Sequence, residues 1–441
     1  MWKGEYMHAN LRTLFNFQYI YTLNCRYMDI PHGHTLSFLD AMRLSGPVAF
    51  NVMVKPVGSL CNLDCAYCYY LDKSGIYGGE TALMSDEVLE KVISESIRSN
   101  ESEEITFEWH GGEPLAAGLD FFRKALALQE RYADGRKVNN TLQTNGTLIT
   151  PRWAAFLKEN DFLVGISIDG PADLHDRFRK DKGGRPSFDK VMAGIMCLHR
   201  SGVRFNTMTT VNRASEGRGK EVYSFLKSVG SRYMQFMPVV EHIRVPDEDG
   251  ARPCIAGPRE EGAYLAPWSV SAAGFGQFMC DIFDVWVRND VGEYFVNLFD
   301  ATLANWCGVS PGICVYCDVC GGNPVIEHNG DVYPCDHFVY KDYRLGNVSN
   351  QSLADMVRSQ SRFGFEKHGS LPEKCLNCRY FGLCHGECPK HRFEHTLDGQ
   401  PGLNTLCEGY MMFYQHTAQY FLKMRHLLEQ SLPPSMIMSD L

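Results

Sequence analysis

The sequence predicts an α/β fold in which a mostly parallel sheet is followed by a small cysteine-rich module and a C-terminal helix. From residue 47 onward, short β-rich runs alternate about six times with helix-like segments. This alternation is typical of βαβ units and leaves two architectures open, a barrel and a doubly wound sheet. Cysteines then gather between residues 307 and 410, and a helix-like stretch follows.

The repeating part can be divided into elements by residue type and spacing. Strands are expected at 50–54, 105–109, 141–144, 162–168, 203–211 and 233–240, where apolar, β-branched and aromatic residues cluster. Helices are expected at 85–99, 119–132, 151–160, 188–200 and 219–229. Ser85 is a suitable N-cap for the first of these helices, because its hydroxyl can accept a hydrogen bond from a free backbone N–H.

Five regions follow from these patterns. Residues 1–46 form an N-terminal extension, 47–268 the strand-and-helix region, 269–306 a helical linker, 307–410 the cysteine-rich module, and 411–441 a C-terminal helix and tail. The extension does not resemble a signal peptide, because Asn16 and Gln18 interrupt its apolar run. A start at Met42 or Met53 is the alternative. Prolines and acidic residues predict a loop or linker at 242–268.

The composition narrows the class of protein. With 43 Lys and Arg against 52 Asp and Glu, the net charge is −9, which disfavours binding to nucleic acid. No window has the 18 or more apolar residues of a membrane span, so no membrane partner is expected. The 17 cysteines are grouped in clusters, which is typical of metal sites in a reducing compartment. We therefore expect a cytoplasmic protein.

The first cysteine cluster follows the first expected strand. Cys61, Cys65 and Cys68 are spaced four and three residues apart. Three thiolates at this spacing can hold one face of a 4Fe-4S cluster and leave one iron open to a substrate or cofactor. A structural zinc site is the alternative, but it prefers four ligands in paired CxxC motifs.

This CxxxCxxC motif, with Tyr67 between the last two cysteines, resembles the radical S-adenosylmethionine (SAM) superfamily. The segments His110-Gly-Gly-Glu-Pro114 and Gly165-Ile-Ser-Ile-Asp-Gly-Pro171, each at the end of an expected strand, agree with it. The resemblance implies a partial (β/α)6 barrel and a bound SAM whose reductive cleavage gives a 5′-deoxyadenosyl radical. It also implies SAM contacts from Tyr67, Gly112, Ser167, Arg179 and Val240.

Two further groups of thiols lie in the cysteine-rich module. Cys314, Cys317, Cys320 and Cys335 form one group, and Cys375, Cys378, Cys384, Cys388 and Cys407 form the other. Spacing alone leaves zinc ribbons possible. Beside a radical SAM core, the module resembles the SPASM domain, which holds two auxiliary 4Fe-4S clusters.

A narrower resemblance is carried by Asn329-Gly-Asp-Val-Tyr-Pro-Cys-Asp-His-Phe338 and Gly386-Glu-Cys-Pro-Lys-His-Arg-Phe393. These segments are similar to the anaerobic sulfatase-maturating enzymes, and the similarity extends from about residue 47 to about 430. It implies one cluster on Cys314, Cys320, Cys335 and Cys388, and another on Cys375, Cys378, Cys384 and Cys407.

Several thiols fall outside this ligand pattern. Cys307 and Cys317 are additional to it, and Cys317 could replace Cys314 as a ligand. The remaining cysteines are interpreted as ordinary free thiols; they are Cys25, Cys197, Cys254 and Cys280.

The resemblance implies an oxidoreductase that, without oxygen, converts a Cys or Ser in a sulfatase to Cα-formylglycine. Its partner would be an unfolded sulfatase with a Cys/Ser-x-Pro-x-Arg motif, and flavodoxin or ferredoxin would supply electrons. Asp336 matches the family's base for the substrate thiol or hydroxyl. An ordinary aspartate is a weak base for a thiol, so proton loss must be coupled to oxidation.

Two other functions remain as alternatives. A SPASM-type maturase could form thioethers or crosslinks in a small precursor peptide, although residues 1–46 are short for a precursor-recognition domain. A non-enzymatic iron-sulfur or zinc module would leave the open-iron motif unexplained.

Overall fold

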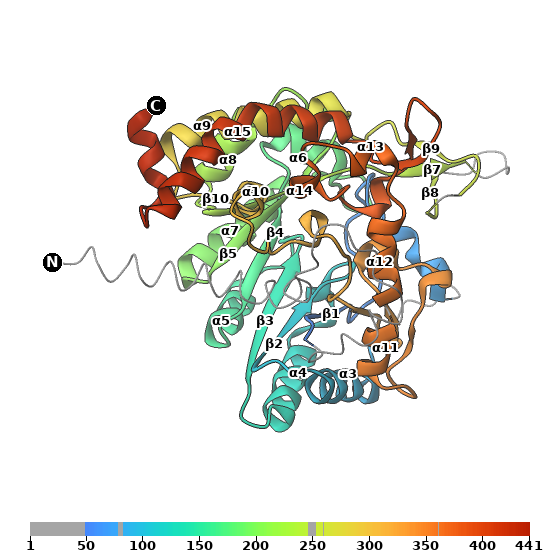
Figure 1. Cartoon of the computed structure of the whole chain (residues 1–441). Coiled ribbons are helices and arrows are strands. Elements are labelled where there is room, and N and C mark those ends of the chain that lie inside the picture. The colour runs from blue at the N-terminus through green and yellow to red at the C-terminus, as the bar shows by residue number, and fades with distance from the viewer. Residues whose placement is uncertain (1–48, 78–82, 246–252, 259, 360) are drawn as a thin grey trace.

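The computed structural model describes residues 49–77, 83–245, 253–258, 260–359 and 361–441 (Figure 1). The predicted N-terminal extension, the alternative start at Met42 and Cys25 lie outside these described residues.

Six parallel strands in chain order form the centre of the molecule. Each strand pairs with the next one along the chain. They are β1 (Val52–Val54), β2 (Glu104–Trp109), β3 (Lys137–Thr144), β4 (Leu163–Ser167), β5 (Phe205–Val211) and β6 (Tyr233–Pro238). Because the order never reverses, the doubly wound alternative is wrong. The predicted partial barrel is confirmed.

The sheet continues beyond both ends of this series. Strand β10 (Phe295–Val296) pairs in parallel with β6, and β11 (Val325–Ile326) pairs in parallel with β1. Two antiparallel strands, β12 (Asp331–Tyr333) and β13 (Gly346–Asn347), complete a ten-stranded sheet. The cysteine-rich region is therefore joined to the edge of the barrel next to the first cysteine loop.

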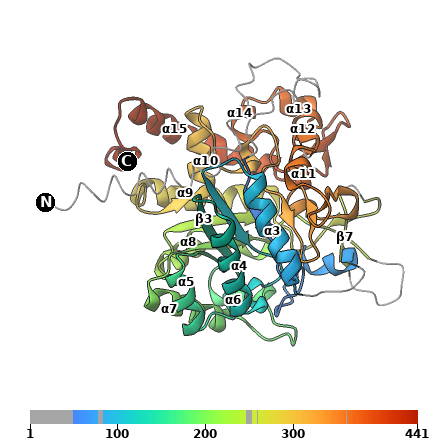
Figure 2. The same ribbon diagram turned by 90° about the horizontal axis from the view of Figure 1, so that it is seen from below.

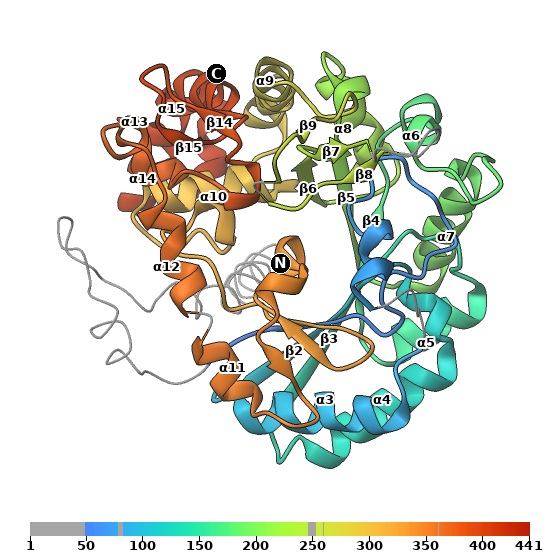
Figure 3. The same cartoon turned by 90° about the vertical axis from the view of Figure 1, so that its right-hand side faces the viewer.

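Helices cover the outer side of the curved sheet (Figure 3). They are α3 (Asp86–Ser99), α4 (Leu119–Tyr132), α5 (Pro151–Glu159), α6 (Ala172–Phe178), α7 (Phe188–Ser201) and α8 (Gly219–Ser228). Each has a buried apolar face that packs on fully buried strand residues such as Phe107 and Ile166. The Ser85 hydroxyl accepts a hydrogen bond from the Val88 N–H, so the predicted N-cap of α3 is confirmed.

The long C-terminal helix packs along a helix that follows the barrel. These two helices are α9 (Ala272–Asn289) and α15 (Cys407–Glu429), and α10 (Asn297–Trp306) lies against α15. In Figure 2 they lie on the side of the molecule away from α5 and α7. The backbones of α9 and α15 approach closely at Gly276 and Gly409, where a Cβ on either glycine would overlap the other helix.

The remaining elements are short. The cysteine-rich region contains α11 (Leu353–Ser359), α12 (Ser361–Gly369), α13 (Glu373–Leu376), α14 (Phe381–Cys384), β14 (Glu394–His395) and β15 (Pro401–Leu403). The 3-10 turns are η1 (Leu71–Tyr77), η2 (Pro114–Ala117), η3 (Arg213–Ser215), η4 (Cys314–Tyr316), η5 (Asp336–Phe338), η6 (Lys341–Tyr343), η7 (Pro389–His391) and η8 (Pro434–Asp440). Among the described residues, no helix combines the length and apolar character needed to cross a membrane.

The loop predicted at 242–268 is partly wrong. It contains a small antiparallel sheet formed by β7 (His242–Arg244), β8 (Cys254–Ile255) and β9 (Tyr264–Leu265). Strands of two or three residues are too short to show an alternating pattern, which is why the sequence does not reveal them. The sequence pattern does not predict α6, whereas α10 lies within the helical linker predicted at 269–306.

Candidate active site

The first three cysteines lie together in the loop that follows β1. Burial raises the pKa of the Cys61 thiol to about 11, and the neighbouring Cys68 thiol raises it further. Burial also raises the pKa of Cys65, with added contributions from Cys68 and Cys61. Such mutual effects require thiols that lie close together. An iron-sulfur cluster would replace these protons, because thiolates are its ligands.

The glycine-rich turn after β2 packs directly on this cysteine loop. The Gly112 N–H donates to the Gly58 carbonyl at 2.8 Å, and the Glu113 N–H donates to the Leu60 carbonyl at 2.9 Å. A Cβ on Gly112 would lie 2.0 Å from the Leu60 oxygen, so only glycine fits. With its N–H already used, Gly112 can offer a SAM ammonium group only its carbonyl oxygen.

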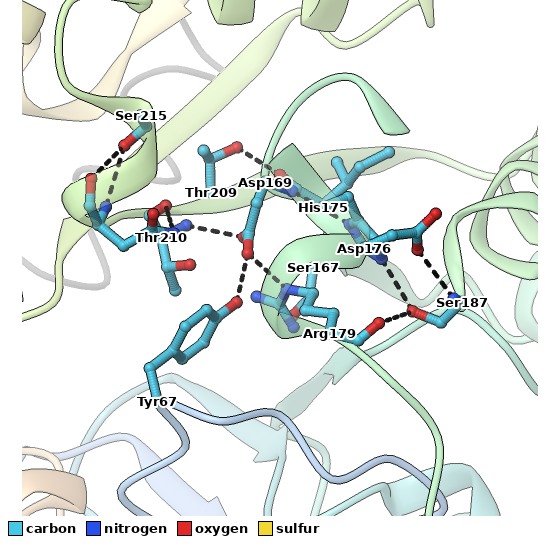
Figure 4. A network of polar contacts seen from close by, with 12 residues as sticks. Tyr67, Ser167, Asp169, His175, Asp176, Arg179, Ser187, Thr209, Thr210 and Ser215 are labelled. Carbon is cyan, nitrogen blue, oxygen red and sulfur yellow. Dashed lines mark hydrogen bonds and ion pairs between the residues drawn. The ribbon is translucent and has the colours of Figure 1, made fainter. Parts of the chain in front are cut away.

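A buried ion pair lies at the carboxyl end of β4 (Figure 4). Arg179 Nε is 3.0 Å from an Asp169 carboxylate oxygen, and the Tyr67 hydroxyl donates to the same oxygen. Burial alone would raise the pKa of Asp169, but the Arg179 guanidinium lowers it below its ordinary value. Sequence reasoning missed Asp169 as a site residue, although it lies inside the Gly165–Pro171 motif. The pair fixes the two predicted SAM contacts Tyr67 and Arg179 against each other.

Other predicted SAM contacts lie on neighbouring strands. The Ser167 hydroxyl at the end of β4 accepts a hydrogen bond from Gln143 Nε2 on β3 at 3.1 Å. Val240, just beyond β6, is fully buried. The structure therefore brings Tyr67, Ser167 and Arg179 to one rim, whereas for Val240 it shows only a place in the apolar core.

Asp336 faces the cysteine loop from the other side. It lies on η5, directly after Cys335, and pairs with the ammonium group of fully buried Lys55. The Tyr69 hydroxyl also donates to Asp336. Burial alone would raise the pKa of Asp336, but Lys55 and His110 hold it below its usual range. Lys55 and Tyr69 are further site residues that sequence reasoning did not assign.

The first auxiliary group of thiols comes from four separate places in the cysteine-rich region. Burial raises the pKa of Cys388, and the charges of Glu387, Cys320, Cys314 and Cys335 raise it further. These four cysteines are therefore neighbours, as the family pattern implies. His337 Nδ1 also lies 3.3 Å from the Cys388 sulfur.

The second auxiliary group is formed near the start of α15. Burial raises the pKa of Cys384 to about 12, with smaller contributions from Glu387, Cys407 and Cys375. Cys378 in turn raises the pKa of Cys407. The thiols of Cys375, Cys378, Cys384 and Cys407 therefore surround one place.

Each of the three groups consists of thiols alone. Thiolates are the ligands of iron-sulfur clusters, and the groups supply three, four and four of them. Within the part of the chain that the structure describes, no three His, Cys, Asp or Glu side chains converge closely enough to hold one metal ion.

The two additional thiols behave differently. Cys307 has Arg425 and Glu429 as its charged neighbours and no thiol among them. Cys317 is buried and disulfide-bonded, and its sulfur lies 3.3 Å from the Ile313 carbonyl oxygen. The choice between Cys314 and Cys317 as ligand stays a prediction.

Comparison with known proteins connects these sites to a family. Residues 56–226 match the radical SAM superfamily, and residues 317–379 match an iron-sulfur cluster-binding domain known as SPASM. A serine-type anaerobic sulfatase-maturating enzyme of Bacteroides thetaiotaomicron is 49% identical over 393 residues, covering 88% of this chain and 94% of the relative. The chain belongs to the anaerobic sulfatase-maturating enzyme family. It is therefore a radical SAM enzyme, and the non-enzymatic alternative is set aside.

Other relatives agree with this family. A cysteine-type anaerobic sulfatase-maturating enzyme of Clostridium novyi is 31% identical, covering 83% of this chain and 95% of the relative. The solved structure of anSMEcpe with bound AdoMet and the Cp18Cys peptide matches with a TM-score of 0.73 and 30% identity, covering 85% of this chain and 99% of that one. The radical SAM and SPASM domains of this maturating enzyme imply SAM, one SAM-binding 4Fe-4S cluster and auxiliary clusters.

Proposed function

We propose that this maturating enzyme oxidises a Ser or Cys within a Ser/Cys-x-Pro-x-Arg motif of an unfolded sulfatase to Cα-formylglycine, and that it accepts serine. The 49% identity to a serine-type relative supports the choice of serine. The observation that carries the proposal is Asp336, which joins an auxiliary thiol to the radical SAM loop through Lys55 and Tyr69.

The proposed ligand sets follow the three thiol groups. Cys61, Cys65 and Cys68 would hold the SAM-binding cluster, and the two groups of four thiols would hold the auxiliary clusters. Arg179 and the Gly112 carbonyl would bind the carboxylate and ammonium of SAM, with Tyr67, Ser167 and Val240 around it. Bound SAM and the clusters would supply hydrogen abstraction and electron acceptance.

The protein's own part in the proposed reaction is to hold and deprotonate the substrate. Asp336 is anionic at neutral pH, because Lys55 lowers its pKa. It would accept the substrate hydroxyl proton, while one hydrogen atom leaves Cβ and one electron leaves the substrate; an auxiliary cluster would supply the acceptor for that electron. Removing the proton, hydrogen atom and electron leaves a Cβ=O double bond, which is the aldehyde. Proton transfer to so weak a base requires that it be coupled to loss of the electron.

The decisive experiment compares two aspartates in the same region. Asp336→Asn should lower formylglycine formation on a Ser-x-Pro-x-Arg peptide by about 100-fold or more, in line with the loss of a general base. Asp342→Asn, at an exposed position on η6, should leave it unchanged. The measurement is anaerobic mass spectrometry of the peptide together with 5′-deoxyadenosine. Wild-type rates in Asp336→Asn would overturn the proposed role.

The reductant and compartment are further parts of the proposal. Flavodoxin or ferredoxin would supply the electron that starts the reaction, in the cytoplasm, where thiols stay reduced. Replacing dithionite by reduced flavodoxin or ferredoxin should sustain aldehyde formation. No turnover with either protein would exclude both as donors.

A further inference from the structure

Lys367 is a fully buried lysine on α12 that has no part in the proposed proton transfer. Its ammonium group donates to the carbonyl oxygens of Cys314 at 2.8 Å and Val315 at 3.0 Å, and also to that of Cys317. All three carbonyls belong to the turn that presents Cys314. The lysine therefore places one positive charge against the backbone of the turn that carries this thiol.

The ammonium group of Lys367 is held by backbone carbonyl oxygens and not by a carboxylate. Among the described residues, no Asp or Glu lies within ion-pair distance of Lys367. A buried ammonium group without a counter-ion is costly, and carbonyl dipoles only partly replace its hydration. The negative groups in the surroundings of Lys367 are the carboxylates of Asp318 and Glu387 and, once deprotonated, the thiols of the first auxiliary group. Lys367 lowers the pKa values of Cys314 and Cys320, although burial raises both overall.

The packing of α12 fixes this charge in place. The Cys320 N–H donates to the Gly364 carbonyl at 3.2 Å, and a Cβ on Gly364 would lie 2.2 Å from the Cys320 oxygen. Arg392 donates to the Lys367 carbonyl and to the Gly386 carbonyl, the latter at 2.9 Å. The helix therefore cannot move the ammonium group away from the thiols without losing these contacts.

Two carboxylates oppose Lys367, namely Asp318, which pairs with His385, and Glu387. Glu387 is buried beside Cys388 and accepts hydrogen bonds from His391 at 2.9 Å and from Asn404 at 2.6 Å. The Lys367 ammonium, by contrast, bonds directly to the turn that carries Cys314.

We propose that Lys367 is a positioning residue that raises the reduction potential of the first auxiliary cluster and so makes this cluster a better acceptor for the substrate electron. The inference rests on the proposed function and its ligand set. A reduced cluster carries one more negative charge than an oxidised one, so a buried cation stabilises the reduced form more. Removal of the charge should therefore make the cluster harder to reduce.

The test is a redox titration followed by electron paramagnetic resonance. The full chain carries Cys61→Ala, Cys65→Ala and Cys68→Ala, so that only the auxiliary clusters give a signal. Lys367→Gln keeps a hydrogen-bond donor but removes the charge, and Lys367→Arg keeps the charge. In Lys367→Gln we expect one midpoint to fall by at least 59 mV, which is a tenfold change in the one-electron equilibrium. The other auxiliary cluster is an internal reference and should not shift.

Lys374→Met is the matched control, because Lys374 lies beside Cys375 and Cys407 of the second group. It should leave the midpoint of the first cluster unchanged. Lys367→Arg should keep the wild-type midpoint. If the Lys367→Arg and Lys367→Gln proteins both lose the first auxiliary cluster, the inference is overturned. Loss of the cluster in Lys367→Gln alone would support the need for the charge.

An unshifted midpoint in a Lys367→Gln protein that holds both auxiliary clusters would also overturn the inference about Lys367. The proposed ligand set fails by a different result, namely the absence of two auxiliary clusters from the parent protein before Lys367 is changed.

Discussion

His175 is a neutral side chain that supports the residues at the carboxyl end of β4, where SAM contacts are predicted. It is fully buried, and its Nδ1 accepts a hydrogen bond from the Asp169 N–H at 3.4 Å. Its Nε2 lies 3.0 Å from the Ser187 hydroxyl, which donates to the Arg179 carbonyl at 2.7 Å. Nδ1 must therefore be unprotonated and Nε2 must carry the hydrogen (Figure 4). Protonation of Nδ1 would place two donors, Nδ1–H and the Asp169 N–H, opposite each other and break this hydrogen bond.

This arrangement predicts a loss of stability in mild acid. Burial lowers the pKa of His175 to about 4, whereas an unfolded histidine titrates at about 6.5. Between these values the unfolded chain binds more protons, so stability is full above about pH 6.5 and falls as the pH falls. The loss from His175 should reach about 2 kcal/mol at about pH 5.

The measurement is the urea midpoint of the anaerobic holoenzyme at several pH values. His175→Gln should be less stable than the wild type at neutral pH and should lose less stability toward pH 5. A parallel decline of the two proteins would contradict the assignment of this titration to His175.

Sequence reasoning found site residues that are marked by spacing and missed those that act across the fold. Cys61, Cys65 and Cys68 lie close together in the chain, so their spacing reveals them. Lys55 meets Asp336 from 281 residues away, and Lys367 is 53 residues from the carbonyl of Cys314. An isolated lysine has no local pattern that distinguishes a buried charge from a solvated one, and only the fold supplies its partner.

At the scale of elements, the long periodic segments were predictable and the short ones were not. The predicted helix at 119–132 matches α4, and the strand at 105–109 matches β2 to within one residue. Each has enough residues to show its period and a clear terminal signal. Strands β7 to β9 form because neighbouring segments supply partners, which no local pattern records.

The close contact of α9 and α15 predicts that an alanine at the crossing point destabilises the protein, although helix propensity alone predicts that it stabilises the helix. Gly409→Ala should favour α15 by about 1 kcal/mol from propensity alone. The new Cβ would lie 2.1 Å from the Ala272 carbonyl oxygen of α9, however, so the helices must separate. We expect a net destabilisation of about 1–3 kcal/mol, as in other overpacked interiors. The urea midpoint followed by circular dichroism measures it.

Gly369→Ala is the matched control, because a Cβ on this last residue of α12 meets no atom within 4 Å. It should leave the midpoint unchanged or raise it slightly. A Gly409→Ala protein as stable as this control would show that the two helices are not held at the observed separation.

At the scale of the whole molecule, Cys388 connects two parts of the cysteine-rich region. Its thiol lies with cysteines that are distant in the sequence and not with its neighbours in the chain. Cys388 lies between Cys384 and Cys407 in the chain, but its thiol belongs with Cys314, Cys320 and Cys335. Spacing alone would assign it to the nearer group. The family resemblance implies the grouping of these four thiols, since it reflects the fold rather than the local sequence.

The grouping of Cys388 with Cys314, Cys320 and Cys335 predicts that one auxiliary cluster can be lost while the other is kept. Cys388→Ala removes one proposed ligand of the first auxiliary cluster and leaves all four proposed ligands of the second in place. Anaerobically reconstituted protein should therefore lose about four iron atoms per chain. Aldehyde formation should be abolished because the substrate electron has lost its acceptor, while SAM cleavage without peptide should continue from the intact Cys61, Cys65 and Cys68 site. Iron analysis, Mössbauer spectra and the two product assays measure these outcomes.

Cys197→Ala is the matched control for this change, because Cys197 lies on α7, remote from the thiol groups along the barrel. It should keep the full iron content and activity. If Cys388→Ala instead loses the second auxiliary cluster and keeps the first, Cys388 belongs with its sequence neighbours, and the first cluster would then need a different fourth ligand. A loss of both clusters would mean that the two sites fold as one unit, because the segment from Cys375 to Cys407 supplies ligands to each.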